Sequence, residues 1–425
     1  MNRKNSIWTG IIHMGLGTVL AQMINIIAQP ILTRVFPAET LGIYTYLISL
    51  ASMVIPVASL KLDMLIVSDT DDMEAQYITD TCIIVNVVIA ILYAIVIFIG
   101  YNCFENNIFN KYGLVIYIVP VLVFTNGLRF LFISYLNRYK EYKTISVIAI
   151  LREAIRAVIQ VGAGFLSFGV VALSMGYAIS PLFGLKIQMK GYLKKLQNRQ
   201  RLNASKFKQI LFEKGRRQIL YLVPAQFINS FSSSLVIISI TALFSAKVLG
   251  YYSAGARILD IPIIFITSNV SKVCYQQISE NVAKNEPVLK TLLSVISVLS
   301  IVSVLGFGIL YFIAPTISEI IFGKGYSIAG EYIKCLCVMY AVRLVATSFS
   351  GVYTVFKKQN FELILNILLI VSAVASYLIC NALECEVTTY LHCMNLGYTF
   401  VYLIMLFGYI IVCKNYDKRI AKLKE

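Results

Sequence analysis

The sequence has few of the side chains on which enzymes and metal sites depend. Of its 425 residues, two are histidine and 21 are acidic. His13 and His392 fall in opposite halves without neighbours at ligand spacing, which argues against a catalytic or metal role. The nine cysteines are scattered, and the pair Cys335 and Cys337 lacks the further ligands that a metal site needs. We therefore expect no catalytic residues, no metal and no cofactor.

Charged residues are also scarce, at 14% of the chain, whereas 58% of residues are hydrophobic. A large soluble protein would show many charged surface helices, and these are almost missing. Instead, twelve apolar segments have roughly the 20 residues that a helix needs to cross a bilayer. These segments cover about residues 10–35, 41–66, 78–100, 113–136, 144–166, 169–189, 218–243, 249–271, 288–313, 330–356, 361–382 and 388–413. The composition predicts an all-α polytopic membrane protein.

The net charge of +16 is distributed unevenly among the loops. If the amino terminus is cytoplasmic, the inside segments carry 25 Lys and Arg residues and the outside segments carry three. An excess of Lys and Arg on short cytoplasmic loops fixes the orientation of most membrane proteins, so both termini are predicted to be cytoplasmic. A nucleic-acid-binding surface would not alternate loop by loop, and we expect no nucleic-acid partner.

The longest polar stretch predicts the domain organisation. We expect a six-helix bundle over 1–189, a basic cytoplasmic linker over 190–217, a second six-helix bundle over 218–413 and a basic tail over 414–425. In the linker, basic and apolar residues alternate, which fits an amphipathic helix on anionic headgroups. A charged loop that only fixes the topology fits equally well.

The two predicted bundles repeat each other. Ala21–Asn25 returns as Ala225–Asn229, and the segment 32–44 returns as 240–252. Six spans per half means that both halves enter the membrane from the same side, as parallel repeats do. Membrane proteins with two similar halves can open a cavity alternately to either side, so the repeat points to a transporter.

Polar side chains occupy matching places within the repeat. Gln22 and Asn25 share one face of the first span, and Gln226 and Asn229 share one face of the seventh. Hydrogen bonds that join helices would explain them. Alternatively, they form two polar walls of a water-filled cavity and bind sugar hydroxyls.

Five arginines lie deep within the spans, where a charge is costly unless it faces protein or water. Arg152 and Arg156 lie one turn apart and repel each other, so an anion would offset their cost. Pairing of Glu153 with Arg156, and of Asp260 with Arg257, would satisfy two of the five without any ligand.

Arg129 and Arg343 have no acidic residue nearby in sequence and occupy equivalent places in the two halves. They are the strongest candidates for an anion site, because the guanidinium fork suits phosphate and pyrophosphate oxygens. A cation exporter would need buried carboxylates instead, and these are few. Asp63 and Asp260 are candidates for coupling transport to protons or sodium ions.

Three motifs carry a resemblance to a known family. They are Pro30–Arg34 followed by Leu41–Tyr44, the basic turn Tyr135–Lys143, and Leu249–Ile258. The chain resembles the polysaccharide exporters of the multidrug/oligosaccharidyl-lipid/polysaccharide flippase superfamily, often called Wzx-type O-antigen or capsule-repeat flippases. The likeness extends in order over nearly the whole chain.

The resemblance implies two six-helix bundles in a V around a central cationic cavity. It implies that the chain moves undecaprenyl-pyrophosphate-linked oligosaccharides to the outer leaflet of the bacterial inner membrane. A polymerase and a chain-length regulator of the same pathway are then expected partners. By analogy, the arginines that attract pyrophosphate or acidic sugars would be Arg34, Arg129, Arg152, Arg156, Arg257 and Arg343.

Three alternatives fit less well. A drug/cation antiporter of the same superfamily would carry a buried acidic cluster. A membrane glycosyltransferase, polymerase or ligase would need a large external loop with catalytic residues, whereas the longest outside stretch here is about 314–329 with Glu319 as its only carboxylate. A lipid II flippase usually has two further spans.

Overall fold

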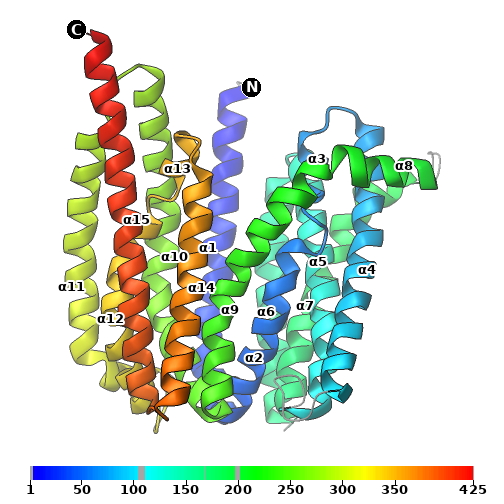
Figure 1. Cartoon of the computed structure of the whole chain (residues 1–425). Coiled ribbons are helices and arrows are strands. Elements are labelled where there is room, and N and C mark those ends of the chain that lie inside the picture. The colour runs from blue at the N-terminus through cyan, green and yellow to red at the C-terminus, as the bar shows by residue number, and fades with distance from the viewer. Residues whose placement is uncertain (1–2, 104–110, 167, 197–201, 425) are drawn as a thin grey trace. The chain divides into compact units, whose positions relative to one another are not determined.

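The computed structural model describes residues 3–103, 111–166, 168–196 and 202–424, which are helical and contain no strand (Figure 1). The chain divides into two compact units, unit 1 (Met1–Ile238) and unit 2 (Ser239–Glu425). The first long helices are α1 (Arg3–Val35), α2 (Ala38–Val54), α4 (Asp72–Cys103), α5 (Ile118–Arg138), α6 (Tyr142–Phe165), α7 (Gly169–Leu196) and α9 (Val223–Leu243). The later ones are α10 (Ala246–Ala283), α11 (Leu289–Phe322), α12 (Ser327–Thr347), α14 (Gln359–Ala382) and α15 (Val387–Lys424). Short helices are α3 (Asp63–Ser68), α8 (Ala204–Gln209) and α13 (Gly351–Val355).

Helices suit a chain in lipid because each one satisfies its own backbone hydrogen bonds. Within the described ranges, ten helices are long and apolar enough to cross a membrane. The remaining two predicted spans coincide with α1 and α6, and α6 carries Arg152, Glu153 and Arg156 in its middle. The all-helical membrane fold is therefore confirmed, and the number of twelve spans stays a prediction.

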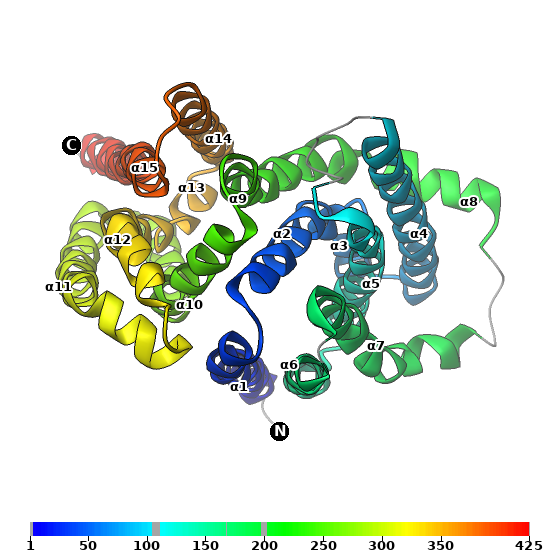
Figure 2. The same cartoon turned by 90° about the horizontal axis from the view of Figure 1, so that it is seen from below.

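The internal repeat is visible in the way each unit pairs its helices (Figure 2). In unit 1, α5 packs against α2, α4 and α7, and α6 packs against α7. In unit 2, α12 packs against α10, α11 and α15, and α14 packs against α15. Helices that match in the sequence repeat thus have matching neighbours. In unit 1, α1 also packs along α6.

Glycines let some of these helices approach closely. A Cβ on Gly330 would come within 2.3 Å of the Pro315 Cα where α12 meets α11. A Cβ on Gly127 of α5 would come within 2.4 Å of the amide of Asn86 on α4. Small residues at such crossings are typical of helix packing in membranes, where van der Waals contact stabilises association.

The described part of the predicted linker belongs to unit 1 and packs on its other elements. Asn203 caps the N-terminus of α8, and its side chain accepts a hydrogen bond of 2.7 Å from the Lys206 backbone N–H. Ile210 is fully buried in a cluster that includes Leu62 of unit 1. A Cβ on Gly215 would come within 2.3 Å of the same Leu62 side chain. The apolar side of this segment therefore contacts protein.

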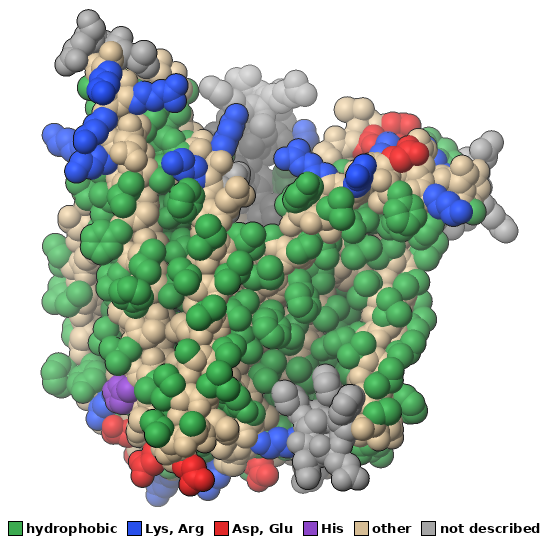
Figure 3. All heavy atoms as spheres, in the orientation of Figure 1, with side chains coloured by type: hydrophobic (Ala, Val, Ile, Leu, Met, Phe, Trp, Pro, Cys, Tyr) green, Lys and Arg blue, Asp and Glu red, His purple; other side chains and the backbone are tan. Residues whose placement is uncertain are grey.

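The two ends of unit 2 differ in charge. On the face shown in Figure 3, hydrophobic side chains cover the middle of its helices, and Lys and Arg gather at the end that carries the C-terminus. A band of apolar side chains between polar ends is what a protein embedded in a bilayer requires.

Candidate functional site

Three arginines and one carboxylate meet in unit 1. On α6, Arg152 and Arg156 each place an Nη2 atom against the carboxylate of Glu153. Glu153 is 5% exposed, so it is nearly removed from solvent. The sequence offered the pairing of Glu153 with Arg156 as an alternative to a bound anion, and the structure has this pair and adds Arg152 to it.

Arg129 of α5 joins this group. Its guanidinium carbon lies 4.0 Å from the centre of the Phe130 ring, and it interacts electrostatically with Arg152, Glu153 and Arg156. We call Arg129, Arg152, Glu153 and Arg156 the arginine cluster. With three guanidinium groups and one carboxylate, it carries a net charge of +2.

The arginine cluster retains free hydrogen-bond donors. The Nε atoms of Arg129 and Arg152 are buried and have no hydrogen-bond partner among the described residues. An unpaired buried donor costs about 1–3 kcal/mol, and more when it is charged. An anion that accepts from these nitrogens would remove that cost and offset part of the net charge.

Neighbouring helices hold the cluster in position. Arg156 lies 5.7 Å from the centre of the Tyr177 ring on α7. Gln160, one turn further along α6, donates 2.8 Å hydrogen bonds to the Tyr44 hydroxyl and to the Leu173 carbonyl. These bonds join α6 to α2 and α7, and they hold the part of α6 that carries the arginines in place.

Unit 2 places the equivalent arginine differently. Arg343 of α12 lies 3.4 Å from the Asp260 carboxylate of α10 and 5.1 Å from the Tyr340 ring centre. The sequence had shown no acidic neighbour for Arg343, because Asp260 lies 83 positions away. Arg257 also acts electrostatically on Asp260, so two arginines face one carboxylate here.

The remaining binding candidates interact mainly within their own helices. The Gln29 amide donates to Asn25 Oδ1 over 3.3 Å, and the Gln226 amide donates to Ser230 Oγ over 3.4 Å. Gln22 is half-buried, and Asn229 is exposed. Arg34 is exposed and donates to the Pro30 carbonyl over 2.8 Å. The structure does not bring these residues into the arginine cluster.

Asp63, the other coupling candidate, lies at the start of α3 and accepts two hydroxyl hydrogen bonds. Ser59 donates over 2.6 Å, and Ser134 of α5 donates over 3.1 Å. No group of three or more metal-ligating side chains occurs in the described ranges.

Sequence reasoning missed a charge network that attaches the linker to unit 1. Lys214 lies 2.8 Å from Glu74 and 3.1 Å from Asp69, and Lys206 lies 2.8 Å from Glu74. Burial of Asp69 opposes its ionisation, but hydrogen bonds from the Asp71 backbone and from Lys214 keep its pKa below the ordinary value. Burial likewise opposes the charge on Lys214, yet Glu74 and Asp69 raise its pKa. The only signal in the sequence was the alternation of basic and apolar residues in 190–217.

The comparisons with known proteins agree with this architecture. A profile of the family described as polysaccharide biosynthesis protein matches residues 31–330. The chain belongs to this family. The family that the sequence motifs predicted is thereby confirmed. No curated protein matches the sequence of this family member.

Solved structures show the fold of this polysaccharide biosynthesis protein. The lipid II flippase MurJ in an inward closed conformation has a TM-score of 0.73 and 12% identity, over 96% of this chain and 91% of that chain. An inward-facing multidrug resistance MATE family transporter has a TM-score of 0.68 and 12% identity, over 96% and 99% of the two chains. A MOP superfamily transporter from Pyrococcus furiosus has a TM-score of 0.60 and 13% identity, over 100% and 97%. The chain has the fold of MOP superfamily transporters.

Proposed function

We propose that the protein is a flippase for undecaprenyl-pyrophosphate-linked oligosaccharide repeat units of O-antigen, capsule or exopolysaccharide. It moves them by alternating access from the cytoplasmic to the outer leaflet of a bacterial inner membrane. The family and the transporter fold support a transport role in polysaccharide synthesis. The arginine cluster supports an anionic cargo.

The observation that carries the proposal is the unpaired arginine donors. Arg129 and Arg152 keep buried Nε–H groups without partners in the described part of the chain, beside a net charge of +2. Guanidinium groups bind phosphate oxygens through paired, charge-assisted hydrogen bonds. A pyrophosphate linkage offers several such oxygens at once. Arg34, Arg257 and Arg343, with Gln22, Asn25, Gln226 and Asn229, would contact the cargo elsewhere along its path.

In this proposal both termini are cytoplasmic, and the basic linker 190–217 joins the two six-helix bundles on that side. Asp63 and Asp260 are the groups that would couple transport to protons or sodium ions. A polymerase and a chain-length regulator would receive the exported units. No catalytic role is proposed for any residue.

A drug/cation antiporter is the second candidate, because MATE transporters share the fold. A cationic drug would be repelled by the arginine cluster, whose only carboxylate already contacts Arg152 and Arg156. Charge therefore favours the flippase.

Flipping in proteoliposomes tests the proposal. A lipid-linked oligosaccharide is reconstituted with the protein, and its exposure to an external sugar-modifying enzyme is followed. We expect protein-dependent exposure that slows about tenfold or more in Arg129→Ala, because a hydrogen bond to a charged group contributes roughly 1.5–3 kcal/mol. Arg343→Ala should slow exposure as well.

The control is Arg216→Ala, which removes an exposed arginine outside the spans and should leave the rate unchanged. Absence of flipping together with efflux of a cationic dye would move the assignment to the antiporter. Equal flipping rates in wild type and all variants would show that these arginines do not contribute to transport.

A further inference from the structure

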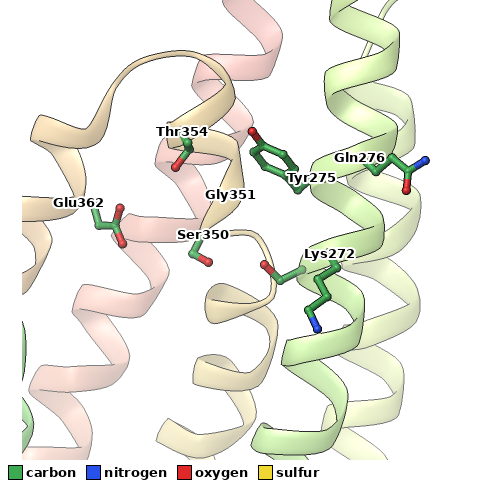
Figure 4. A pocket seen from close by; sticks show the side chains of 8 residues that line it. Lys272, Tyr275, Gln276, Ser350, Gly351, Thr354 and Glu362 are labelled. Carbon is green, nitrogen blue, oxygen red and sulfur yellow. The ribbon is translucent and has the colours of Figure 1, made fainter. Parts of the chain in front are cut away.

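Unit 2 contains a cavity that is separate from the arginine cluster of unit 1. Its volume is about 460 Å³, within the roughly 300–1,000 Å³ of small-molecule sites. It opens between α10, the start of α13 and the first turn of α14 (Figure 4). The lining residues are Ser271, Lys272, Tyr275, Gln276, Ser350, Gly351, Thr354 and Glu362. All but Gly351 carry a polar group.

Several of these groups are free to bind a ligand. The half-buried Glu362 carboxylate makes no hydrogen bond or ion pair with any other described residue. The side-chain hydroxyls of Ser350 and Thr354 likewise have no protein partner in the described ranges. Glu362 stands in the first turn of α14, where the helix dipole stabilises a negative charge. The helix dipole explains why a negative charge is stable at Glu362, but it does not explain why the Ser350 and Thr354 hydroxyls beside it lack partners.

An aromatic ring completes the cavity. Tyr275 points from α10 toward Gly351 and Thr354 (Figure 4). It rests on Gly351 so closely that a Cβ there would come within 2.9 Å of the Tyr275 Cδ2 atom. The tyrosine is still 45% exposed, which leaves ring surface available to a ligand. Gly351 therefore positions the ring by having no side chain.

This combination fits a sugar ring. A pyranose presents an apolar C–H face, which packs on an aromatic ring, and a rim of hydroxyl groups that both donate and accept hydrogen bonds. Ser350, Thr354 and Glu362 could bind that rim. A phosphate would be repelled by Glu362, because the Lys272 side chain points away from that carboxylate (Figure 4). A large apolar compound would leave the hydroxyls unpaired.

We propose that the cavity binds a hexopyranose residue of the cargo saccharide, while the arginine cluster binds its phosphates. The inference rests on the proposed function. In the proposed topology the cavity lies at the cytoplasmic end of unit 2, because Lys272 and Lys357 belong to predicted inside loops. The sugar would thus be recognised where the lipid-linked unit first meets the protein.

Saturation-transfer NMR on the full-length protein in lipid nanodiscs tests the site without transport. The probes are methyl α-glucoside, N-acetylglucosamine and glucosamine. We expect transfer from wild type, and about tenfold weaker binding in Glu362→Gln and Thr354→Val. The first replaces a charged acceptor with a neutral amide, and the second removes a hydroxyl group. Gly351→Ala should weaken binding by displacing Tyr275. Preferential binding of glucosamine would show that Glu362 pairs with an ammonium group of the sugar.

Gln277→Ala is the matched control. Gln277 is exposed, does not line the cavity and donates to Asn281 over 3.5 Å, so sugar binding should be unchanged. Equal binding by wild type, Glu362→Gln and Thr354→Val, or no binding of any probe, would overturn the proposal. If wild type flips lipid-linked saccharide without binding these probes, the cavity proposal falls and the flippase stands. Sugar binding that the variants weaken, in a protein that does not flip the lipid-linked saccharide, would support the sugar site and reject the flippase function.

Discussion

At the scale of single residues, Glu153 holds the arginine cluster together. It contacts Arg152 and Arg156 and is nearly inaccessible to water. We expect Glu153→Gln to lower the free energy of unfolding by about 3 kcal/mol, because two arginines one turn apart would lose their shared counter-charge. Denaturant unfolding in nanodiscs would measure the loss.

Glu213→Gln is the control for that experiment, since Glu213 is exposed. A Glu153→Gln protein as stable as wild type would mean that water or lipid already compensates the arginines.

The sequence located Arg129 and Arg343 but not the carboxylates that face them. The repeat identified Arg129 and Arg343 as equivalent positions, and both lie in charged surroundings. Their different counter-charges were invisible, because Glu153 and Asp260 reach them from other helices. Contacts across a bundle depend on how helices rotate against each other, and local spacing does not determine this.

At the scale of elements, the attachment of the linker should depend on pH. Asp69 has a depressed pKa, so its contribution is present above its ordinary value of 3.8 and is lost as pH falls through the lower folded value. Lys214 has a raised pKa, so its contribution is present below 10.5 and is lost as pH rises through the higher folded value. Glu74, Lys206 and Arg138 face the same network.

We expect Lys214→Met to release the segment 204–215 at neutral pH, as acid does in wild type. Amide hydrogen exchange of that segment is the measurement, and faster exchange is the expected result. Lys208→Met, which removes an exposed lysine, should leave exchange as in wild type. Unchanged exchange in Lys214→Met would show that burial of Ile210 and the Lys206–Glu74 ion pair hold the segment without Lys214.

Long helices could be predicted well, because twenty apolar residues have few alternatives in a membrane. The short elements could not. α8 and α13 have six and five residues, too few to show a periodicity. The sugar cavity depends on α13, and its lining comes from two segments about 80 residues apart along the chain, 271–276 and 350–362. No motif in the sequence indicates it.

At the scale of the whole molecule, the predicted topology can be measured with existing and introduced cysteines. Cys103 is exposed at the end of α4, on the predicted outer side. In right-side-out vesicles that carry Cys385→Ser, which removes a half-exposed cysteine of another predicted outside loop, an impermeant maleimide should label Cys103, and Cys103→Ser should abolish that signal. A cysteine placed at the exposed position Lys418 should react only after permeabilisation. The reverse pattern would invert the orientation.

The charges on α6 also have a consequence for how the chain is made. Each arginine at the centre of a lone helix costs roughly 2.5–3.5 kcal/mol during insertion by the translocon. α6 carries two of them with its own counter-ion, Glu153, and packs against α1 and α7. One of these helices leaves the ribosome long before α6 and the other directly after it. The helices of unit 1 should therefore not form a stable bundle until α7 has been synthesised. Truncated chains that end before Gly169 should be degraded by quality-control proteases.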